Sequence, residues 1–439
     1  MKLTFKPLIL SLVVLLFASC GSDSAGLTEE DTSTPGQSTK PNVLLIIADD
    51  MGLDATPGFN VGSVKPNMPN LQNMINSGVR FTNLWSYPTC TPTRSSILTG
   101  KYGFRTGVMK VDDPLPTTET SLQQFLEDKN TGYSNAVIGK WHLSTSPSHP
   151  TQMGVDYYAG LLSGGVRSYW EWNFTQNQST SGSNEYTTTK FTDLAIDWIQ
   201  GQDQPWFLWL AYNAPHTPFH LPPTNLHSQG NLPSDDASIS ANPLPYYLAM
   251  IEAMDSEIGR LLASMTQEEK DNTIIIFIGD NGTPGQVIQD YRTRRAKGSL
   301  YQGGVNVPMV VSGKNVERFN QTEDQLLNTV DLFATISEIA GAGVNEINDS
   351  RSFKELLTSP SNSLSRDFAY TEHGQSIGDD EYTIRNANYK YIMFTDGSEA
   401  FYDLTNDFFE NTNLLSGTLS AEEQEQLNSL KETLNNLKQ

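Results

Sequence analysis

The chain has 439 residues, of which 37% are hydrophobic and 10% aromatic, and its formal net charge is −22. This length and composition are typical of a globular protein with a large hydrophobic core, and they exclude a disordered chain. The acidic excess argues against a nucleic-acid partner, because contacts with phosphates need a surplus of Lys and Arg.

The first twenty residues have the pattern of a bacterial lipoprotein signal. A basic start precedes an apolar stretch at 8–18, which is too short to span a bilayer and is followed by Cys20. We therefore expect a signal peptide at 1–19, lipidation of Cys20, and a flexible tether at 20–40. The lipid would be the only membrane attachment and would place the protein in the bacterial cell envelope, on the periplasmic or the outer face. The alternative is an ordinary signal peptide with a chance cysteine.

Cys90 is the only other cysteine. If Cys20 carries lipid, Cys90 has no disulfide partner in the mature chain, so it is either a packing residue or a reactive group. It stands in the stretch YPTCTPTRSSILTG at 87–100, close to the fixed cation Arg94. A helix is predicted to begin near Thr93, and its positive end would favour an anion there.

Four apolar runs are predicted to be strands of one sheet, and each is followed by polar residues. The runs are 43–48, 136–139, 206–211 and 273–278. Continuous apolar strands are buried on both faces, which is typical of a mostly parallel sheet with helices on both sides. Ligands bind beyond the carboxyl ends of such strands, so the polar residues there are expected to share one crevice. They are Asp49, Asp50, Lys140, His142, His216, Asp280 and Asn281.

The residue types of this set are chemically coherent. Carboxylate and amide oxygens suit a hard divalent cation, Ca²⁺ or, with less support, Mg²⁺. Zinc is less favoured, because the set is not rich in histidine or thiolate ligands. Lysine and histidine side chains suit an oxyanion or a leaving group. Each residue alone could belong to a turn, but a shared catalytic crevice explains all of them together.

Helical periodicity at 191–198 and 246–265 predicts scaffold helices, whereas 161–189 and 220–245 are predicted to be loops beside the crevice. Aromatic and basic side chains in the first of these loops and elsewhere along the chain are candidates for weak substrate contacts. They are Arg105, Arg167, Tyr169, Trp170, Trp172, Arg292, Arg295 and His373. Packing is the alternative for the aromatic residues, and a solvated basic face is the alternative for Arg292 and Arg295.

These motifs occur in the order found in the formylglycine-dependent (type I) sulfatases of the alkaline phosphatase superfamily. The sequence resembles that family from about 41 to 415. The matching stretches are PNV at 41–43 through ADDMG at 48–52, CTPTR at 90–94 with LTG at 98–100, GKWHL at 139–143, APH at 214–216, GDNG at 279–282 and KGSLYQGG at 297–304. YKYI at 389–392 and FYDL at 401–404 resemble the small terminal domain of the family.

The resemblance implies an α/β fold: a large mixed, mostly parallel sheet sandwiched by helices, followed by a small C-terminal α+β domain with a short antiparallel sheet. On this basis we expect a catalytic domain at 41–345 and a C-terminal subdomain at 346–439.

The resemblance also implies the chemistry. A separate maturase would oxidise Cys90 to formylglycine (3-oxoalanine), whose hydrate is the nucleophile. The implied metal ligands, with Ca²⁺ as the expected ion, are Asp49, Asp50, Cys90, Asp280 and Asn281, and Asp280 is also the implied base. The other implied catalytic residues are Arg94, which holds the hydrate, Lys140 and Lys297, which neutralise the sulfate, His216, which protonates the leaving alcohol, and His142, which assists sulfate release.

The expected function is hydrolysis of a sulfate ester on a polysaccharide or oligosaccharide. One alternative is a formylglycine-dependent phosphodiesterase or phosphonate monoesterase, because sulfate and phosphate esters share a tetrahedral shape. The other is a catalytically silent, lipid-anchored glycan-binding protein of the same fold.

Overall fold

The computed structural model describes residues 40–360, 366–374 and 380–439. The expected signal peptide, the lipidation site at Cys20 and all of the tether but Lys40 lie outside the described residues. The residues described all belong to one compact unit. None of the helices in these ranges is long and apolar enough to cross a membrane.

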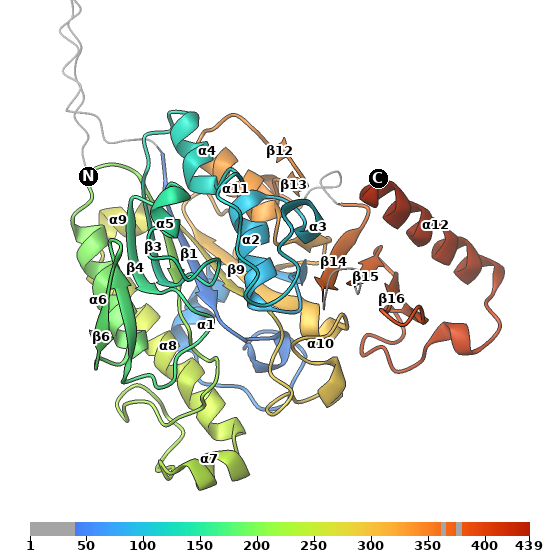
Figure 1. Ribbon diagram of the computed structural model, residues 1–439, viewed down its shortest axis with the longest axis horizontal. Coiled ribbons are helices and arrows are strands. Elements are labelled where there is room, and N and C mark those ends of the chain that lie inside the picture. The colour runs from blue at the N-terminus through green and yellow to red at the C-terminus, as the bar shows by residue number, and fades with distance from the viewer. Residues whose placement is uncertain (1–39, 361–365, 375–379) are drawn as a thin grey trace, which may run out of the picture. The chain divides into compact units, whose positions relative to one another are not determined.

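A sheet of eleven strands forms the centre of this unit (Figure 1). The strand order is β10-β2-β9-β8-β1-β7-β3-β4-β5-β6, and β11 also pairs with β2. The neighbours β8, β1, β7, β3 and β4 are all parallel, whereas β9 and the β5–β6 hairpin pair antiparallel with their neighbours. The strands are β1 (Asn42–Ala48), β2 (Gly78–Trp85), β3 (Ser134–Lys140), β4 (Tyr157–Leu161), β5 (Trp172–Gln176), β6 (Ser179–Ser183), β7 (Trp206–Ala211), β8 (Thr273–Gly279), β9 (Asn306–Gly313), β10 (Gln321–Glu323) and β11 (Leu327–Asn328).

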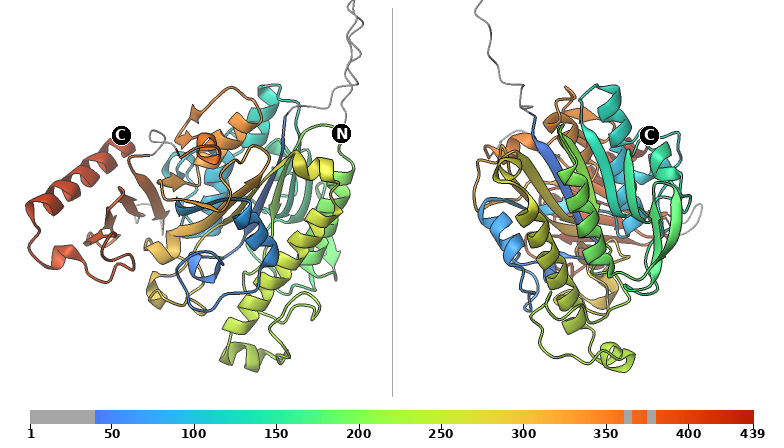
Figure 2. Two further views of the ribbon diagram at one scale, coloured as in Figure 1. Left: turned by 180° about the vertical axis from the view of Figure 1, so that it is seen from behind. Right: turned by 90° about the vertical axis from the view of Figure 1, so that its left-hand side faces the viewer.

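Helices cover both faces of the sheet (Figure 2). Successive residues of β1 point to opposite faces, so Leu44 and Ile46 belong to one hydrophobic core and Leu45 and Ile47 to the other. The first core includes α1 (Pro69–Asn76), α6 (Thr187–Gln200) and α8 (Leu244–Ser264). The second includes α2 (Cys90–Thr99), α4 (Leu122–Asp128) and α11 (Asp331–Ile339). The short helices are α3 (Gly103–Thr106), α5 (His149–Gln152), α7 (Asp236–Ala241), α9 (Gln267–Asp271) and α10 (Gln302–Val305).

The two scaffold helices expected from periodicity are confirmed as α6 and α8, but the loop predicted at 161–189 contains the β5–β6 hairpin. The alternation of Trp172, Asn173, Phe174 and Thr175 in β5 favours a strand and was missed, whereas β6 carries only Ser, Thr and Gly and gives no such signal. The turn between them uses positive φ angles at Asn177 and Gln178, as two-residue hairpin turns do.

A second, antiparallel sheet follows near the C-terminus, in the order β14-β15-β16-β17. Its strands are β14 (Ala369–Gly374), β15 (Asp380–Arg385), β16 (Tyr389–Met393) and β17 (Glu399–Asp403), and β12 (Glu346–Ile347) and β13 (Ser350–Arg351) form a small separate pair. Helix α12 (Ala421–Lys438) packs on the sheet through Leu427, Leu430 and Leu434. The small α+β unit is thus confirmed, while the boundary at 345/346 stays a prediction.

Candidate active site

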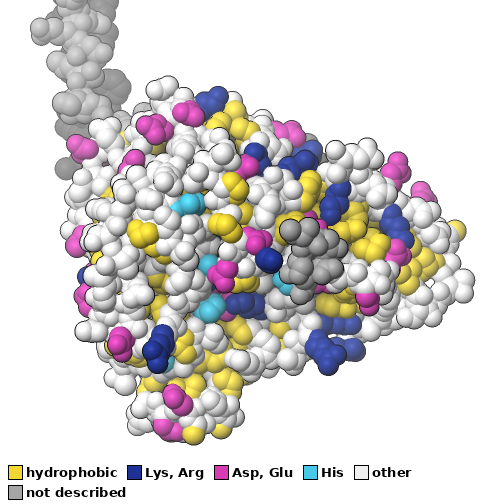
Figure 3. Space-filling view, viewed as in Figure 1, with side chains coloured by type: hydrophobic (Ala, Val, Ile, Leu, Met, Phe, Trp, Pro, Cys, Tyr) yellow, Lys and Arg dark blue, Asp and Glu magenta, His cyan; other side chains and the backbone are white. Residues whose placement is uncertain are grey.

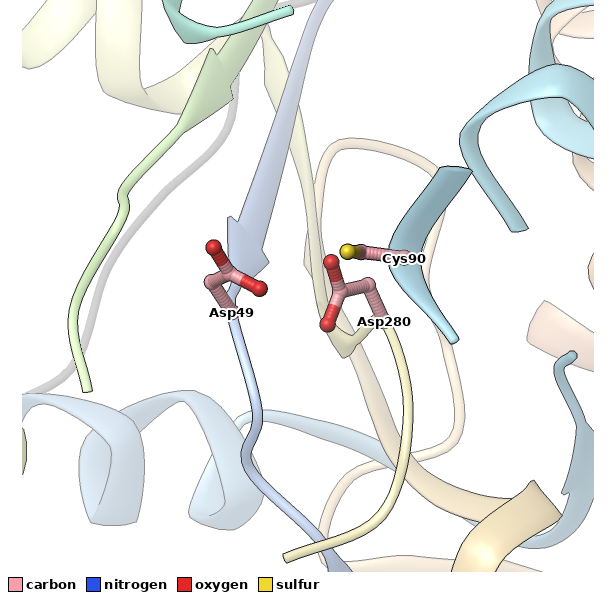
Figure 4. Close-up of side chains that lie close together, drawn as sticks. All are labelled: Asp49, Cys90 and Asp280. Carbon is pink, nitrogen blue, oxygen red and sulfur yellow. The ribbon is translucent and has the colours of Figure 1, made fainter. Parts of the chain in front are cut away.

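The polar residues predicted to share a crevice follow strands that are neighbours in the sheet. Strands β8, β1, β7 and β3 lie side by side and run parallel, so their carboxyl ends share one edge. Asp280 follows β8, Asp49 follows β1, and Lys140 is the last residue of β3. Helix α2 brings Cys90 to the same place, and Figure 4 shows the side chains of Asp49, Cys90 and Asp280 pointing toward one another.

Cys90 is the first residue of α2, three residues earlier than the sequence predicted. Pro92 does not prevent this start, because the first turn of a helix makes no use of its backbone N–H groups. All ten residues of α2 are buried. The positive end of the helix is therefore held inside the protein at the strand ends, where it favours an anion.

Two buried ion pairs border Cys90. Lys140 Nζ lies 2.5 Å from Asp49 Oδ2 and 3.4 Å from Cys90 Sγ. Arg94 donates from Nη2 to Asp280 Oδ2 at 2.8 Å and from Nη1 to the Lys140 carbonyl at 2.6 Å. All four charged side chains are fully buried. Charges are retained at such depth only when they are paired, so the cations are fixed in place before any ligand arrives.

Burial dominates the protonation of these groups. It raises the pKa of Asp280 to about 7, with Asp49 adding to the shift. Burial also disfavours the charged form of Asp49, but the surrounding cations, Lys140 above all, outweigh it and hold the Asp49 pKa well below its usual range. Burial raises the pKa of the Cys90 thiol, so an unmodified Cys90 is a protonated and poor nucleophile.

The site contains buried oxygens that suit a metal ion. Asp49 Oδ1 and Asn281 Oδ1 have no hydrogen-bond partner among the described residues. Ligand atoms of Asp49, Cys90 and Asp280 lie within 4.8 Å of one another, as do those of Asp49, Asp50 and His216. Buried acceptors without donors are costly, and a bound cation would satisfy them. An oxygen-rich donor set of this kind fits a hard divalent cation.

Two further predicted residues, Lys297 and His216, line the outer side of the site. Lys297 Nζ donates to Asp50 Oδ2 at 2.7 Å, and His216 Nε2 lies 3.8 Å from the same oxygen. Their side chains are 22% and 20% exposed, so both can be reached from solvent. His142 is more deeply placed, with Nδ1 3.2 Å from Cys90 Sγ. Burial, with help from Lys140, lowers the pKa of His142 to about 2, which keeps its ring neutral.

In Figure 3, histidine, acidic and basic side chains gather near the middle of the visible face. Two cavities lie beside this catalytic set, and Arg167 lines both. One, of 690 Å³, is also lined by Gly165, and the other, of 760 Å³, by Thr217. Both residues are close to His216: a Cβ on Gly165 would lie 3.2 Å from its ring, and the Thr217 carbonyl is 2.7 Å from its Nδ1. Arg167 is exposed and makes no hydrogen bond or ion pair within the part of the chain that the structure describes.

The aromatic substrate candidates divide into buried and exposed rings. Tyr169 is 1% exposed and donates to the carbonyls of Asn213 and His216, so it supports the loop that carries His216. Trp172 is 5% exposed and packs in the core, whereas Trp170 is 38% exposed. Burial of Tyr169 and Trp172 favours packing over contact with a sugar face.

Three of the four remaining weak candidates, Arg105, Arg295 and His373, make contacts within or with the C-terminal part of the chain. Arg105 pairs with Asp349 at 2.8 Å and also donates to a carbonyl of α12. Arg295 donates to backbone carbonyls at 409 and 410 and lies over the ring of Tyr301. His373 lies in β14, 3.4 Å from Glu381, and Arg292 is exposed. Among the described residues, no hydrogen bond or ion pair joins any of these four to the buried catalytic set.

Sequence reasoning missed Asp112, whose Oδ1 lies 2.7 Å from His142 Nε2. Asp112 stands before Asp113 and Pro114, a pattern typical of a turn, and nothing in the sequence relates it to a residue thirty positions later. It also missed Tyr247, which lies in the first turn of the scaffold helix α8 and donates to the Asp50 carbonyl at 2.8 Å.

Family models match the chain from residue 41 to its last residue. The model described as "Sulfatase" matches residues 41–342, and the one described as "N-sulphoglucosamine sulphohydrolase, C-terminal" matches residues 295–439. The chain is 29% identical over 377 residues to the uncharacterized sulfatase YdeN of Escherichia coli, covering 72% of this chain and 65% of that protein. It is 26% identical over 438 residues to arylsulfatase G of Mus musculus, covering 85% and 80%. The chain thus spans less than two thirds of the Escherichia coli relative.

Solved structures show the same fold. BT4656, in complex with its substrate D-glucosamine-2-N,6-O-disulfate, matches with a TM-score of 0.76 at 22% identity, over 90% of this chain and 98% of that chain. Ps i-CgsB, in complex with k-i-k-neocarrahexaose, matches with a TM-score of 0.75 at 23% identity, over 90% and 92%. The phosphonate monoester hydrolase of Agrobacterium radiobacter matches with a TM-score of 0.70 at 19% identity, over 90% and 95%.

Proposed function

The chain belongs to the sulfatase family of sulfuric ester hydrolases, and from this premise we propose that it removes sulfate from a sulfated carbohydrate with a formylglycine made from Cys90. One observation carries the proposal. Cys90 lies at the buried positive end of α2, within 3.4 Å of Lys140 Nζ and 3.2 Å of the neutral ring of His142. An unmodified thiol gains little from that environment, whereas an oxygen nucleophile with a proton to lose gains a cation and a base.

The proposed metal is Ca²⁺, held by Asp49, Asp50, Asp280, Asn281 and residue 90. The unpartnered oxygens Asp49 Oδ1 and Asn281 Oδ1 support this assignment. The ion would supply a Lewis acid for a sulfate oxygen and for the nucleophile.

The chain's own residues act on two sides of the sulfur atom: the side of the nucleophile and the side of the leaving alcohol. The formylglycine hydrate supplies one hydroxyl to attack sulfur and a second whose deprotonation expels sulfate. Arg94 holds residue 90 and Asp280 in place, and Lys140 and Lys297 neutralise the sulfate oxygens. Asp280 lies beside residue 90 as the base for the attack, and His142 faces residue 90 and assists deprotonation of its second hydroxyl.

His216 serves the opposite side, where the leaving alcohol departs. It is partly exposed, and residues beside it line both cavities. It can therefore donate a proton to an alcohol that belongs to a bulky substrate. The size of the cavities supports a sugar as that alcohol, and the exposed cation Arg167 suits an anionic one. The two solved neighbours described with a disulfated glucosamine and a neocarrahexaose also fit this class of substrate.

We also propose where the enzyme acts and which protein modifies it. Lipidation of Cys20 would tether the enzyme in the bacterial cell envelope, and a formylglycine-generating maturase would act on Cys90 before it folds, because Cys90 is buried in the folded chain. Radiolabelled fatty acid should be incorporated by the native chain and by Cys90→Ala, but not by Cys20→Ala. Labelling of Cys20→Ala would contradict the anchor.

The test of the function begins with position 90. Protein from a host with a competent maturase is digested, and peptide 81–94 is analysed by mass spectrometry after treatment with a hydrazide. We expect a trapped aldehyde, and we expect hydrolysis of aryl sulfate to be faster than hydrolysis of an aryl phosphodiester and to vanish in Cys90→Ala. A faster phosphodiester reaction would favour the phosphonate monoesterase alternative. Unmodified Cys90 together with binding of sulfated glycan would favour the silent binding protein.

A further inference from the structure

The His142 ring is held from several sides. Its Nδ1 faces Cys90 Sγ at 3.2 Å, and its Nε2 lies 2.7 Å from Asp112 Oδ1 and 3.2 Å from Thr91 Oγ1. Gly164 closes the remaining space, because a Cβ there would lie 2.4 Å from the ring atoms Cε1 and Nε2. The ring therefore has a fixed orientation, with one nitrogen toward residue 90 and the other toward Asp112.

Asp112 is itself fixed in place by the turn that carries it. Its backbone has a positive φ of 66°, and its N–H donates to Thr91 Oγ1 at 3.1 Å. The neighbouring Asp113 accepts hydrogen bonds at 3.0 Å from the backbone N–H groups of Met109 and Lys110, which closes the turn. Thr91 is the second residue of α2, so the turn is attached to the helix that carries Cys90.

A carboxylate only accepts hydrogen bonds, so it selects the form of a neutral imidazole whose hydrogen points at it. With the hydrogen on Nε2, the lone pair of His142 is on Nδ1, and Nδ1 faces residue 90. The opposite form would present an N–H to residue 90 and could accept no proton from it. The hydrogen bond to Asp112 thus decides whether His142 can act as a base, in the manner of the aspartate in a Ser-His-Asp triad.

We propose that Asp112 is a positioning residue, which holds His142 in the Nε2–H form with Nδ1 directed at residue 90. The catalytic consequence rests on the proposed function, but the positioning itself does not. Asp112 touches no reacting atom, and its side chain is 78% exposed. Water competes at so exposed a carboxylate, so we expect about a tenfold effect on turnover, below the full contribution of a general base.

The first experiment needs neither formylglycine nor metal. The chain has six histidines, so the protein with unmodified Cys90 can be labelled with ¹⁵N-histidine, and the form of each neutral ring read from long-range ¹H–¹⁵N spectra. The His142 signals, assigned from their loss in His142→Gln, should report the Nε2–H form. Asp112→Ala should mix the two forms, and Asp203→Ala, which removes an exposed carboxylate outside this turn, is the control. An unchanged Nε2–H form in Asp112→Ala would overturn the proposal.

The second experiment uses protein with aldehyde verified at position 90 and an aryl sulfate as substrate. Asp112→Ala should lower kcat about tenfold and leave KM within about twofold, because Asp112 contacts the base and not the substrate. Asp112→Asn should recover most of kcat, since its amide oxygen can still accept from Nε2–H. Equal kcat in Asp112→Ala and the native enzyme, with altered spectra, would contradict the catalytic consequence. A native enzyme that is inactive would contradict the proposed function, while the spectra still decide the positioning.

Discussion

Two of the buried charge networks among the described residues differ in how completely they are hydrogen-bonded. The first surrounds Cys90. The second joins Arg366, at the start of the C-terminal part, to Asp331 of α11. In the second network, Asp331 accepts from Arg366 through both carboxylate oxygens and also from the backbone N–H groups of Asn328 and Arg351. In the first, Asp49 Oδ1, Asn281 Oδ1 and Arg94 Nε have no partner among the described residues.

The difference separates a structural network from a functional one. Burial raises the cost of every unpaired polar atom, so a network that only stabilises the fold is expected to be saturated. Asp331 and Arg366 meet that expectation. The network around Cys90 keeps its unpaired oxygens at the strand ends, where ligands of such folds bind. Under the proposed function, the unpaired oxygens are the atoms that the metal ion would contact, and four changes test the contrast.

Asp280→Asn should have the largest effect, because it removes one charge from the unsaturated network. We expect loss of the Ca²⁺-dependent rise in melting temperature and a fall in turnover of about 10³-fold or more, the scale of electrostatic contributions in such sites. The control is Asp54→Asn, which alters another buried carboxylate, bonded to Thr283 and Gln289 outside the proposed ligand set. It should keep the Ca²⁺ response. The measurement is a pair of melting curves, one with Ca²⁺ and one with EDTA. If Ca²⁺ raised the melting temperature of Asp280→Asn as much as that of the native chain, the proposed ligand set would be refuted.

Arg366→Ala breaks the saturated network instead. Removing one partner leaves Asp331 charged and buried, which costs about 3–5 kcal/mol of the free energy of unfolding. Urea titration measures the loss. The Ca²⁺-dependent increment in stability should remain, because the ion binds at the other network. A variant that lost stability only in the presence of Ca²⁺ would show that the two networks are coupled and would remove the contrast.

Lys297→Ala tests the exposed edge of the unsaturated network. Lys297 Nζ pairs with the buried Asp50, and its loss removes one cation from the sulfate oxygens while Asp50 keeps the hydrogen bond from Asn281. We expect kcat/KM to fall about 10²-fold with the fold unchanged. Lys101→Ala is the matched control, because Lys101 pairs with Glu119 at the surface. If both variants hydrolysed aryl sulfate at the native rate, Lys297 would have no catalytic role.

The sequence allowed the strand ends to be predicted because parallel strands impose their own geometry. Asp49, Lys140 and Asp280 each directly follow or end an apolar run, and strand order alone brings them together. Asp112 could not be found in this way, since its contact with His142 depends on a turn with positive φ that no periodicity records. In the β5–β6 hairpin, β6 gave no signal because it carries only Ser, Thr and Gly, whereas the alternation in β5 was a signal that was missed.

The smallest expected effect is a change in KM on substitution of Arg167. This arginine lines the two cavities beside His216. Arg167 is an exposed cation without a partner in the described ranges, and exposed ion pairs contribute up to about 1 kcal/mol. Arg167→Gln should therefore raise KM about threefold to fivefold for a substrate with a second anionic group, and should leave an aryl sulfate unaffected. Arg292→Gln, which alters an exposed arginine that lines neither cavity, is the control. Because salt screens exposed charges, the difference between the two substrates should shrink at high ionic strength. Equal KM values for the native enzyme and Arg167→Gln at low salt would assign the cavities to neutral parts of the substrate.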